Sequence, residues 1–131
     1  MNERTAHRVA FDLRIDPVLV DEYVRRHEAV WPRMLAEIEA AGRRNYSLFL
    51  AGDGRLFGYY ETEDDDAARE YLARSPIAAE WESEMARFFL DLDGRPDQAM
   101  NVLREIFHLD DQLRTARGSS SSASSLKGDE E

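Results

Sequence analysis

The sequence contains no cysteine and only three histidines, and both shortages exclude classes of chemistry. Without cysteine the chain forms no disulfide, offers no thiolate to a metal ion and has no cysteine nucleophile. His7, His27 and His108 stand far apart in the chain, and none has a second ligand at metal-binding spacing. The sequence also lacks a glycine-rich phosphate loop. We therefore expect neither a metal site nor a nucleotide site.

Long apolar runs are missing as well, since none approaches the roughly 20 residues that a membrane-spanning helix needs. Residues 1–8 lack the apolar segment of a secretory signal, so we expect a cytoplasmic protein. The chain has 17 basic and 27 acidic residues, which gives a formal net charge of −10. This charge argues against nucleic acid and membrane partners, because phosphates and anionic lipids attract clustered cations. The expected partner is a small molecule with little or no charge.

The length limits the domain count, because 131 residues are enough for one domain and too few for two ordinary ones. The serine-rich stretch that begins at Gly118 contains one large apolar residue, Leu126. Such a stretch buries too little surface to offset its ordering entropy. We predict one folded domain over residues 1–112 and a disordered, acidic, Ser-rich tail over residues 113–131.

Hydrophobic periodicity predicts the secondary structure of the domain. Apolar residues at every second position predict strands near residues 9–15, 46–50, 56–62 and 102–109. Apolar residues three and four apart predict helices near residues 17–27, 34–41, 63–73 and 76–89. Pro32 cannot continue a helix, so the first two helices are expected to be separate.

The order strand, helix, strand, strand, helix, strand is that of the ferredoxin-like βαββαβ arrangement, an α+β fold. In this arrangement helices cover one face of an antiparallel sheet. Aromatic and aliphatic side chains on the other face need a partner, and a second copy of the chain is the simplest one. We therefore predict a homodimer, a dimeric α/β barrel in which the two sheets face each other.

The densest group of chemically capable side chains contains Tyr23, His27 and Trp31 at spacings of four, with Arg26 beside them. The first two share a helix face next to the predicted break. An imidazole transfers protons near neutral pH, because both of its protonation states are accessible there. The alternative is amphipathic packing beneath the sheet, with His27 bonded to a backbone carbonyl. Spacing alone favours this alternative.

Three further candidates stand singly. Tyr46, after Asn45 at the start of the second strand, either points into a pocket or packs in the sheet. Trp81 is either a core aromatic or a wall against which the C–H face of a sugar stacks. Arg104 is expected to point inward from the last strand, where it would need a carboxylate partner that the sequence does not identify.

Three segments together resemble the L-rhamnose mutarotase family in order and spacing. They are Tyr23-x-x-Arg26-His27-x-x-x-Trp31-Pro32, Asn45-Tyr46 and Trp81. The resemblance extends from about Val9 to Leu109. It implies a ferredoxin-like homodimer that interconverts the α and β anomers of L-rhamnose without a metal or a cofactor.

The resemblance also implies roles for individual residues. His27 would be the proton donor, Tyr23 and Tyr46 would contact the sugar, and Trp81 would line the site. Arg26, Trp31 and Asn45 would support these residues. The family commonly has two adjacent tryptophans where this chain has Trp81 followed by Glu82. Glu82 either replaces the second apolar wall as a substrate contact or points elsewhere.

The implied reaction needs only a placed acid and a placed base. The ring oxygen gains a proton, the anomeric hydroxyl loses one, and the ring closes again on the other face of the aldehyde. We hypothesise that His27 donates to the ring oxygen while Tyr23 or a water relays the other proton. Two alternatives use the same scaffold, namely a cofactor-free monooxygenase and a non-enzymatic sugar-binding protein.

Overall fold

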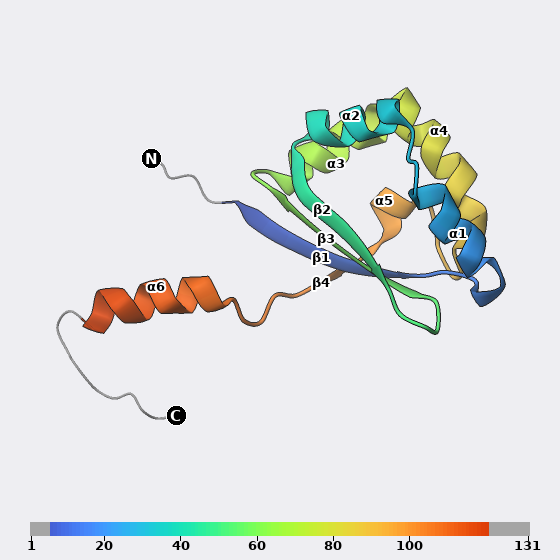
Figure 1. Cartoon of the computed structure of the whole chain (residues 1–131). Helices are drawn as coiled ribbons and strands as arrows, with labels where there is room; N and C mark the ends of the chain where they lie inside the picture. The colour runs from blue at the N-terminus through green and yellow to red at the C-terminus, as the bar shows by residue number, and fades with distance from the viewer. Residues whose placement is uncertain (1–5, 121–131) are drawn as a thin grey trace.

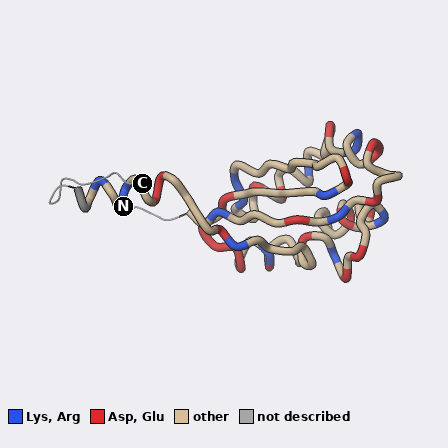
Figure 2. Tube along the Cα trace, turned by 90° about the horizontal axis from the view of Figure 1, so that it is seen from below, with Lys and Arg blue, Asp and Glu red and all other residues tan. Residues whose placement is uncertain are grey.

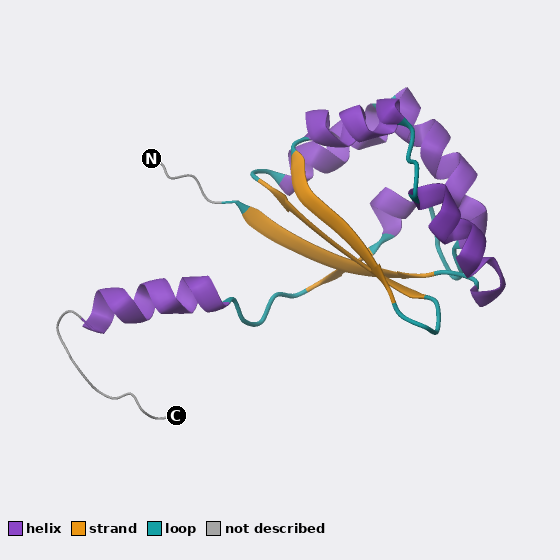
Figure 3. Cartoon of the chain, in the orientation of Figure 1, coloured by secondary structure: helices purple, strands orange, loops and turns teal. Residues whose placement is uncertain are grey.

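The computed structural model describes residues 6–120 and contains one four-stranded antiparallel sheet (Figure 1). The strands lie in the order β2-β3-β1-β4, which is the ferredoxin-like order. Their bounds are β1 His7–Arg14, β2 Arg43–Leu50, β3 Arg55–Thr62 and β4 Asn101–Leu103. Figure 3 shows helices over one face of this sheet, as the sequence predicts.

Six α-helices and two short 3-10 helices accompany the sheet in the described residues. The α-helices are α1 Val20–His27, α2 Pro32–Ala41, α3 Asp65–Arg74, α4 Pro76–Met85, α5 Pro96–Ala99 and α6 Leu109–Ser120. The 3-10 helices are η1 Pro17–Leu19 and η2 Ala86–Phe88. None of the described helices is long and apolar enough to cross a membrane.

The helix ends form where capping chemistry predicts them. The side chain of Ser75 accepts a hydrogen bond from the Ala78 amide, so α4 begins directly after α3. The predicted break before Pro32 is confirmed, because Pro32 is the first residue of α2. Gly42 ends α2 with φ 98°, a left-handed conformation that glycine adopts without steric cost. These ends place α1 and α2 at an angle over the sheet.

The core lies between the sheet and the helices. Alternate residues of β1 and β3 point into it, and Phe11 on β1 lies directly opposite Gly58 on β3. A Cβ atom at residue 58 would lie 2.0 Å from Phe11 Cζ, so only glycine leaves room for this ring. The ring of Phe11 then reaches Tyr46 on β2, with 6.3 Å between the two ring centroids.

The last part of the domain differs from the prediction. The strand predicted over residues 102–109 is wrong beyond Leu103, because pairing with β1 ends where Leu103 meets Ala10. Residues 104–108 form no helix or strand, and Ile106 is 80% exposed. Alternation of apolar and polar residues indicates only that a segment is amphipathic. It does not indicate that a neighbouring strand is available for pairing.

Two smaller predictions also fail in this region. Arg104 does not point inward but is exposed to solvent. Residues 113–120, predicted as part of a disordered tail, belong to α6, which projects from the domain (Figures 1 and 2). The remainder of the predicted tail, residues 121–131, lies outside the described residues. Figure 2 also shows acidic and basic residues interspersed along the domain.

Candidate active site

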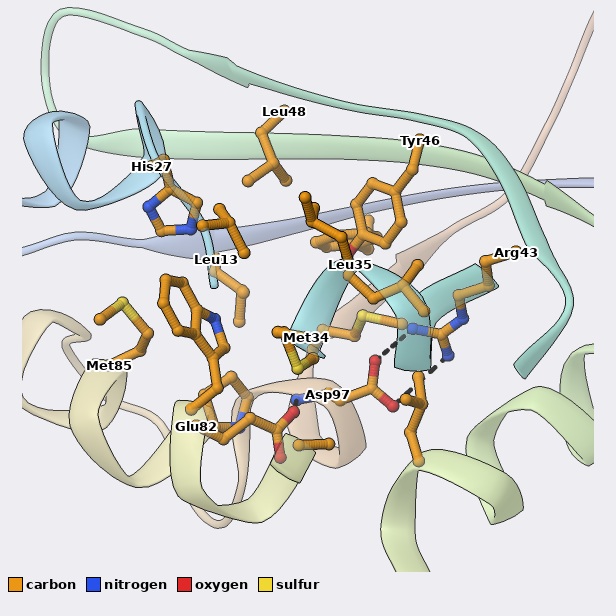
Figure 4. Close-up of a pocket in the computed structure, with 18 of the residues that line it drawn as sticks. Leu13, His27, Met34, Leu35, Arg43, Tyr46, Leu48, Glu82, Met85 and Asp97 are labelled. Atoms are coloured by element: carbon orange, nitrogen blue, oxygen red, sulfur yellow. Dashed lines mark hydrogen bonds and ion pairs between the residues drawn. The ribbon is translucent and has the colours of Figure 1, made fainter. Parts of the chain in front are cut away.

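A cavity of about 740 Å³ lies between the covered face of the sheet and the helices (Figure 4). Side chains of β1, β2, α1, α2, α4 and α5 line it. They include aromatic and aliphatic groups as well as one imidazole, two arginines and three carboxylates. The sequence-predicted residues among them are Tyr23, His27, Asn45, Tyr46, Trp81 and Glu82.

His27 and Tyr23 form the α1 wall of the cavity. Their rings lie one helical turn apart, with 4.3 Å between the centroids. The Nδ1 atom of His27 lies 3.0 Å from the backbone oxygen of Tyr23. A carbonyl oxygen only accepts, so this contact places a proton on Nδ1 and leaves Nε2 as the second proton-transfer atom. The carbonyl bond expected from simple packing is therefore present, and the same ring also lines the cavity.

The burial of His27 changes its protonation. Removal from water disfavours the charged imidazolium and lowers the pKa of His27, while the bond to the Tyr23 carbonyl opposes this effect. Tyr23 responds in the opposite direction, because burial disfavours a phenolate and raises its pKa. At neutral pH the cavity therefore presents a mostly neutral imidazole beside a protonated phenol.

Trp81 on α4 forms the wall beside His27, with 5.5 Å between the ring centroids at an interplanar angle of 80°. The rings of Trp31 and Trp81 meet edge to face, with 5.0 Å between their centroids. Trp31 is not among the residues that line the cavity, so its contact with the site is through Trp81. Arg26 also lies outside the cavity, where it bonds to Glu22 and Glu84 and joins α1 to α4.

Tyr46 reaches the cavity because β2 is irregular at this point. The pairing of β2 with β3 shifts between Arg44 and Ser47, and Asn45 has φ 52°. Asparagine tolerates this left-handed conformation better than most residues, and a bulge of this kind turns the next side chain. The amide of Asn45 bonds to Glu61 on β3 at 3.2 Å. Burial raises the pKa of Tyr46, so its phenol also keeps its proton.

The sequence left open whether Glu82 faces the site or points elsewhere. In the structure Glu82 lines the cavity, and 7% of its surface is exposed. Both carboxylate oxygens are occupied. Oε1 accepts from Arg95 Nε at 2.6 Å, and Oε2 accepts from the Asp97 amide at 3.0 Å. Burial raises the pKa of Glu82, and the bond from Arg95 opposes this effect. A direct contact between Glu82 and a substrate stays a prediction.

Sequence reasoning missed Arg43 and Asp97. Arg43 at the start of β2 is 3% exposed, and its guanidinium forms an ion pair with the carboxylate of Asp97 on α5. Arg104, not Arg43, is the arginine for which the sequence predicts an inward position and a carboxylate partner. The two partners are 54 residues apart, and α5 was not predicted, so no local pattern joins them.

The described residues contain no group of three or more His, Asp or Glu side chains that could hold a metal ion. The cavity instead combines one imidazole, phenol hydroxyls, an indole and an ion pair. Such a set moves protons and binds hydroxyl groups.

Comparisons with known proteins agree with this chemistry. A family model described as L-rhamnose mutarotase matches residues 8–109. An L-rhamnose mutarotase from Oceanobacillus iheyensis is 34% identical over 104 residues, which cover 79% of this chain and 98% of the relative. One from Opitutus terrae is 37% identical over 106 residues, with the same two coverages.

Solved structures show the same fold. An L-rhamnose mutarotase from Formosa agariphila superposes with a TM-score of 0.64 at 25% identity, covering 78% of this chain and 97% of that one. The tetracenomycin F2 cyclase of Streptomyces glaucescens superposes with a TM-score of 0.51 at 22% identity, covering 78% of this chain and 95% of the cyclase. At that identity the second likeness concerns the fold alone.

Proposed function

Because the chain belongs to the L-rhamnose mutarotase family, we propose that it interconverts the α and β anomers of L-rhamnose. It is then an isomerase that opens and closes the pyranose ring by acid and base assistance. The observation that carries this proposal is the position of His27 in the cavity wall, between Tyr23 and Trp81.

The composition of the cavity wall supports a monosaccharide as substrate. The faces of a pyranose carry C–H groups that pack against aromatic rings, and its edge carries hydroxyl groups. Trp81 and Tyr46 offer the aromatic surfaces, and Met34 and Leu48 offer aliphatic surface for a 6-methyl group. Polar side chains in the same cavity are available to the hydroxyl groups.

The proton path that we propose begins at His27. Its Nδ1 keeps a proton for the Tyr23 carbonyl, so the donor is the imidazolium form, which carries a second proton on Nε2. Nε2 gives this proton to the ring oxygen as the C1–O5 bond breaks, which leaves the neutral imidazole. The anomeric hydroxyl loses its proton to a water or through the Tyr23 phenol, which gives the open aldehyde. Rotation about C1–C2 and the reverse transfers close the ring as the other anomer. Both anomers share one path, as microscopic reversibility requires.

The tyrosines act in their protonated form in this scheme. Burial raises the pKa of both Tyr23 and Tyr46, so each offers an O–H donor and an oxygen acceptor to the sugar at neutral pH. Tyr23, whose ring lies beside His27, is the relay in this proposal. Tyr46, on β2, is a substrate contact. Trp31, Arg26 and Asn45 support these walls from outside or from the rim.

We also propose a homodimer formed through the uncovered face of the sheet. Phe49 pairs with Phe57 on this face, and Tyr59 and Leu103 both pair with Ala10. Phe49 is 62% exposed, and exposed aromatic side chains on a sheet face are commonly buried against a second copy. The cytoplasmic location expected from the sequence stays a prediction.

Exchange spectroscopy tests the proposed reaction. In a saturation-transfer NMR experiment the wild type should transfer magnetisation between the two anomeric protons of L-rhamnose faster than buffer alone. L-fucose and D-glucose serve as comparison sugars. A sugar-binding protein would bind L-rhamnose without accelerating exchange, and a monooxygenase would consume dioxygen with an aromatic substrate. If the protein does not accelerate the exchange, and it either binds L-rhamnose or consumes dioxygen, the proposal is overturned.

A further inference from the structure

The cavity has a charged region that the proposed proton transfers do not use. Arg43 and Asp97 form it, and Figure 4 shows their pair on the opposite side of the cavity from His27. Asp97 accepts from both terminal nitrogens of Arg43, and the side chains are 1% and 9% exposed. Neither residue is part of the group that resembles the family in the sequence.

Arg43 is fixed in place from several directions. Its guanidinium lies over the ring of Tyr60, 4.2 Å from the ring centroid. Asp65 lies 3.8 Å from the guanidinium as a second, weaker partner. The Nε–H group is buried and has no hydrogen-bond partner among the described residues.

Asp97 is held in position by Glu82. The Asp97 amide donates to Glu82 Oε2, and Arg95 donates to Glu82 Oε1. Arg95 also donates to the backbone oxygens of Leu72 and Ala73, at 3.1 and 2.9 Å. This network ties the start of α5 to α3 and α4. It therefore sets the position of the Asp97 carboxylate relative to the cavity.

An ion pair in a ligand cavity is well suited to hydroxyl groups. A buried pair contributes little stability compared with apolar side chains of the same volume, so its presence calls for another use. A hydroxyl group donates to a carboxylate and accepts from a guanidinium at the same time. Charge-assisted bonds of this kind are about twice as strong as neutral ones.

The geometry of a pyranose selects which hydroxyl is involved. In a six-membered ring, C3 is the atom opposite the ring oxygen. If His27 contacts the ring oxygen from one side of the cavity, the group facing the other side is the 3-hydroxyl. The 2-hydroxyl is adjacent to the anomeric carbon and lies nearer to His27.

We propose that the Arg43–Asp97 pair recognises the 3-hydroxyl of the sugar, and that Glu82 acts as a positioning residue for Asp97. This inference rests on the proposed mutarotase function. It assigns the site to monosaccharides that carry a 3-hydroxyl, and it gives Glu82 a role other than direct contact with the sugar.

The test removes the proposed hydrogen bond in two ways, once by removing the hydroxyl from the sugar and once by changing the side chain of the protein. Exchange is measured by NMR for L-rhamnose, 3-deoxy-L-rhamnose and 2-deoxy-L-rhamnose with the wild type and Asp97→Asn. The kcat/KM of the wild type should be about 10-fold to 100-fold lower for the 3-deoxy sugar than for L-rhamnose. Asp97→Asn should lose a similar factor on L-rhamnose, mainly through KM, and lose almost nothing further on the 3-deoxy sugar. The penalty for the 2-deoxy sugar should be equal in both proteins.

Two variants and a folding readout keep the test decisive. Arg43→Lys keeps the charge but loses the two-nitrogen contact, and it should show the same non-additive pattern. Glu70→Ala removes an exposed ion pair with Arg74 on α3, away from the cavity, so it should keep the wild-type sugar profile. Near-UV circular dichroism checks that each variant is folded.

The two possible failures are distinguishable. Absence of accelerated L-rhamnose exchange by the wild type would overturn the proposed function and this inference with it. An active wild type whose variants lose the same factor on all three sugars would overturn this inference alone, because that result describes a purely structural ion pair.

Discussion

The imidazole of His27 lies one helical turn beyond Tyr23, with Nδ1 3.0 Å from the Tyr23 backbone oxygen. This contact determines which ring nitrogen carries the proton in the neutral form. It therefore leaves Nε2 to exchange a proton with a ligand. The contact with the carbonyl is the one that the packing interpretation expected. The ring also lines the cavity, and its role in proton transfer stays a prediction.

The first prediction concerns pH. Burial lowers the pKa of His27 below its ordinary value near 6.5. If the imidazolium donates the proton, kcat/KM should rise as the pH falls through this lowered pKa, and then level off. Initial rates of anomer exchange, corrected for buffer, measure the profile. A rate that instead rises with pH through the same midpoint would make neutral His27 a base and contradict the donor role.

The second prediction concerns the relay. Tyr23→Phe removes one hydroxyl but keeps the ring, which packs edge-on against Phe88 and Phe89. The exchange rate should fall about 10-fold or more, while the melting temperature changes little. Tyr71→Phe is the matched control, because Tyr71 is exposed on α3 and does not line the cavity. Equal rates in both variants would exclude Tyr23 as the relay.

The third prediction concerns Glu82. Glu82→Trp should lower the melting temperature by about 5 °C, because it leaves Arg95 and the Asp97 amide without their acceptor. It should also alter the preference between L-rhamnose and L-fucose. Glu82→Gln keeps the shape and one acceptor, so its effects should be smaller. Calorimetry and exchange rates measure the two properties, and an unchanged sugar profile in Glu82→Trp would show that Glu82 does not influence the site.

The fourth prediction concerns the dimer. Phe49→Arg places a charge on the uncovered sheet face and should convert a dimer into a monomer. Val18→Arg is the control, because Val18 is 86% exposed in η1 and does not belong to the sheet. Sedimentation velocity at micromolar concentration distinguishes the two masses. A wild type that sediments as a monomer would contradict the proposed dimer.

Local patterns in the sequence were sufficient to predict the secondary structure of most of the domain. Alternation predicted β1 and β3, and apolar residues three and four apart predicted α2 and α4. Alternation over residues 102–109 was misleading, since amphipathic character alone does not supply a pairing strand. Only contacts with β1 determine that β4 ends at Leu103.

The site was only partly predictable for a related reason. Tyr23 and His27 lie one helical turn apart, so their spacing places them together. Arg43 and Asp97 meet only when β2 and α5 are packed in three dimensions, and no short-range signal links them. The position of Tyr46 likewise depends on the bulge at Asn45, which the strand pattern does not reveal.

The most direct test of the central claim is L-rhamnose anomer exchange by wild type and His27→Asn, measured by saturation-transfer NMR. The wild type should exceed the buffer rate, and His27→Asn should lose about 10²-fold to 10⁴-fold of the catalysed rate. His7→Asn, at the exposed start of β1, should retain wild-type exchange. Wild-type exchange in a folded His27→Asn protein would contradict the role of His27 as the proton donor.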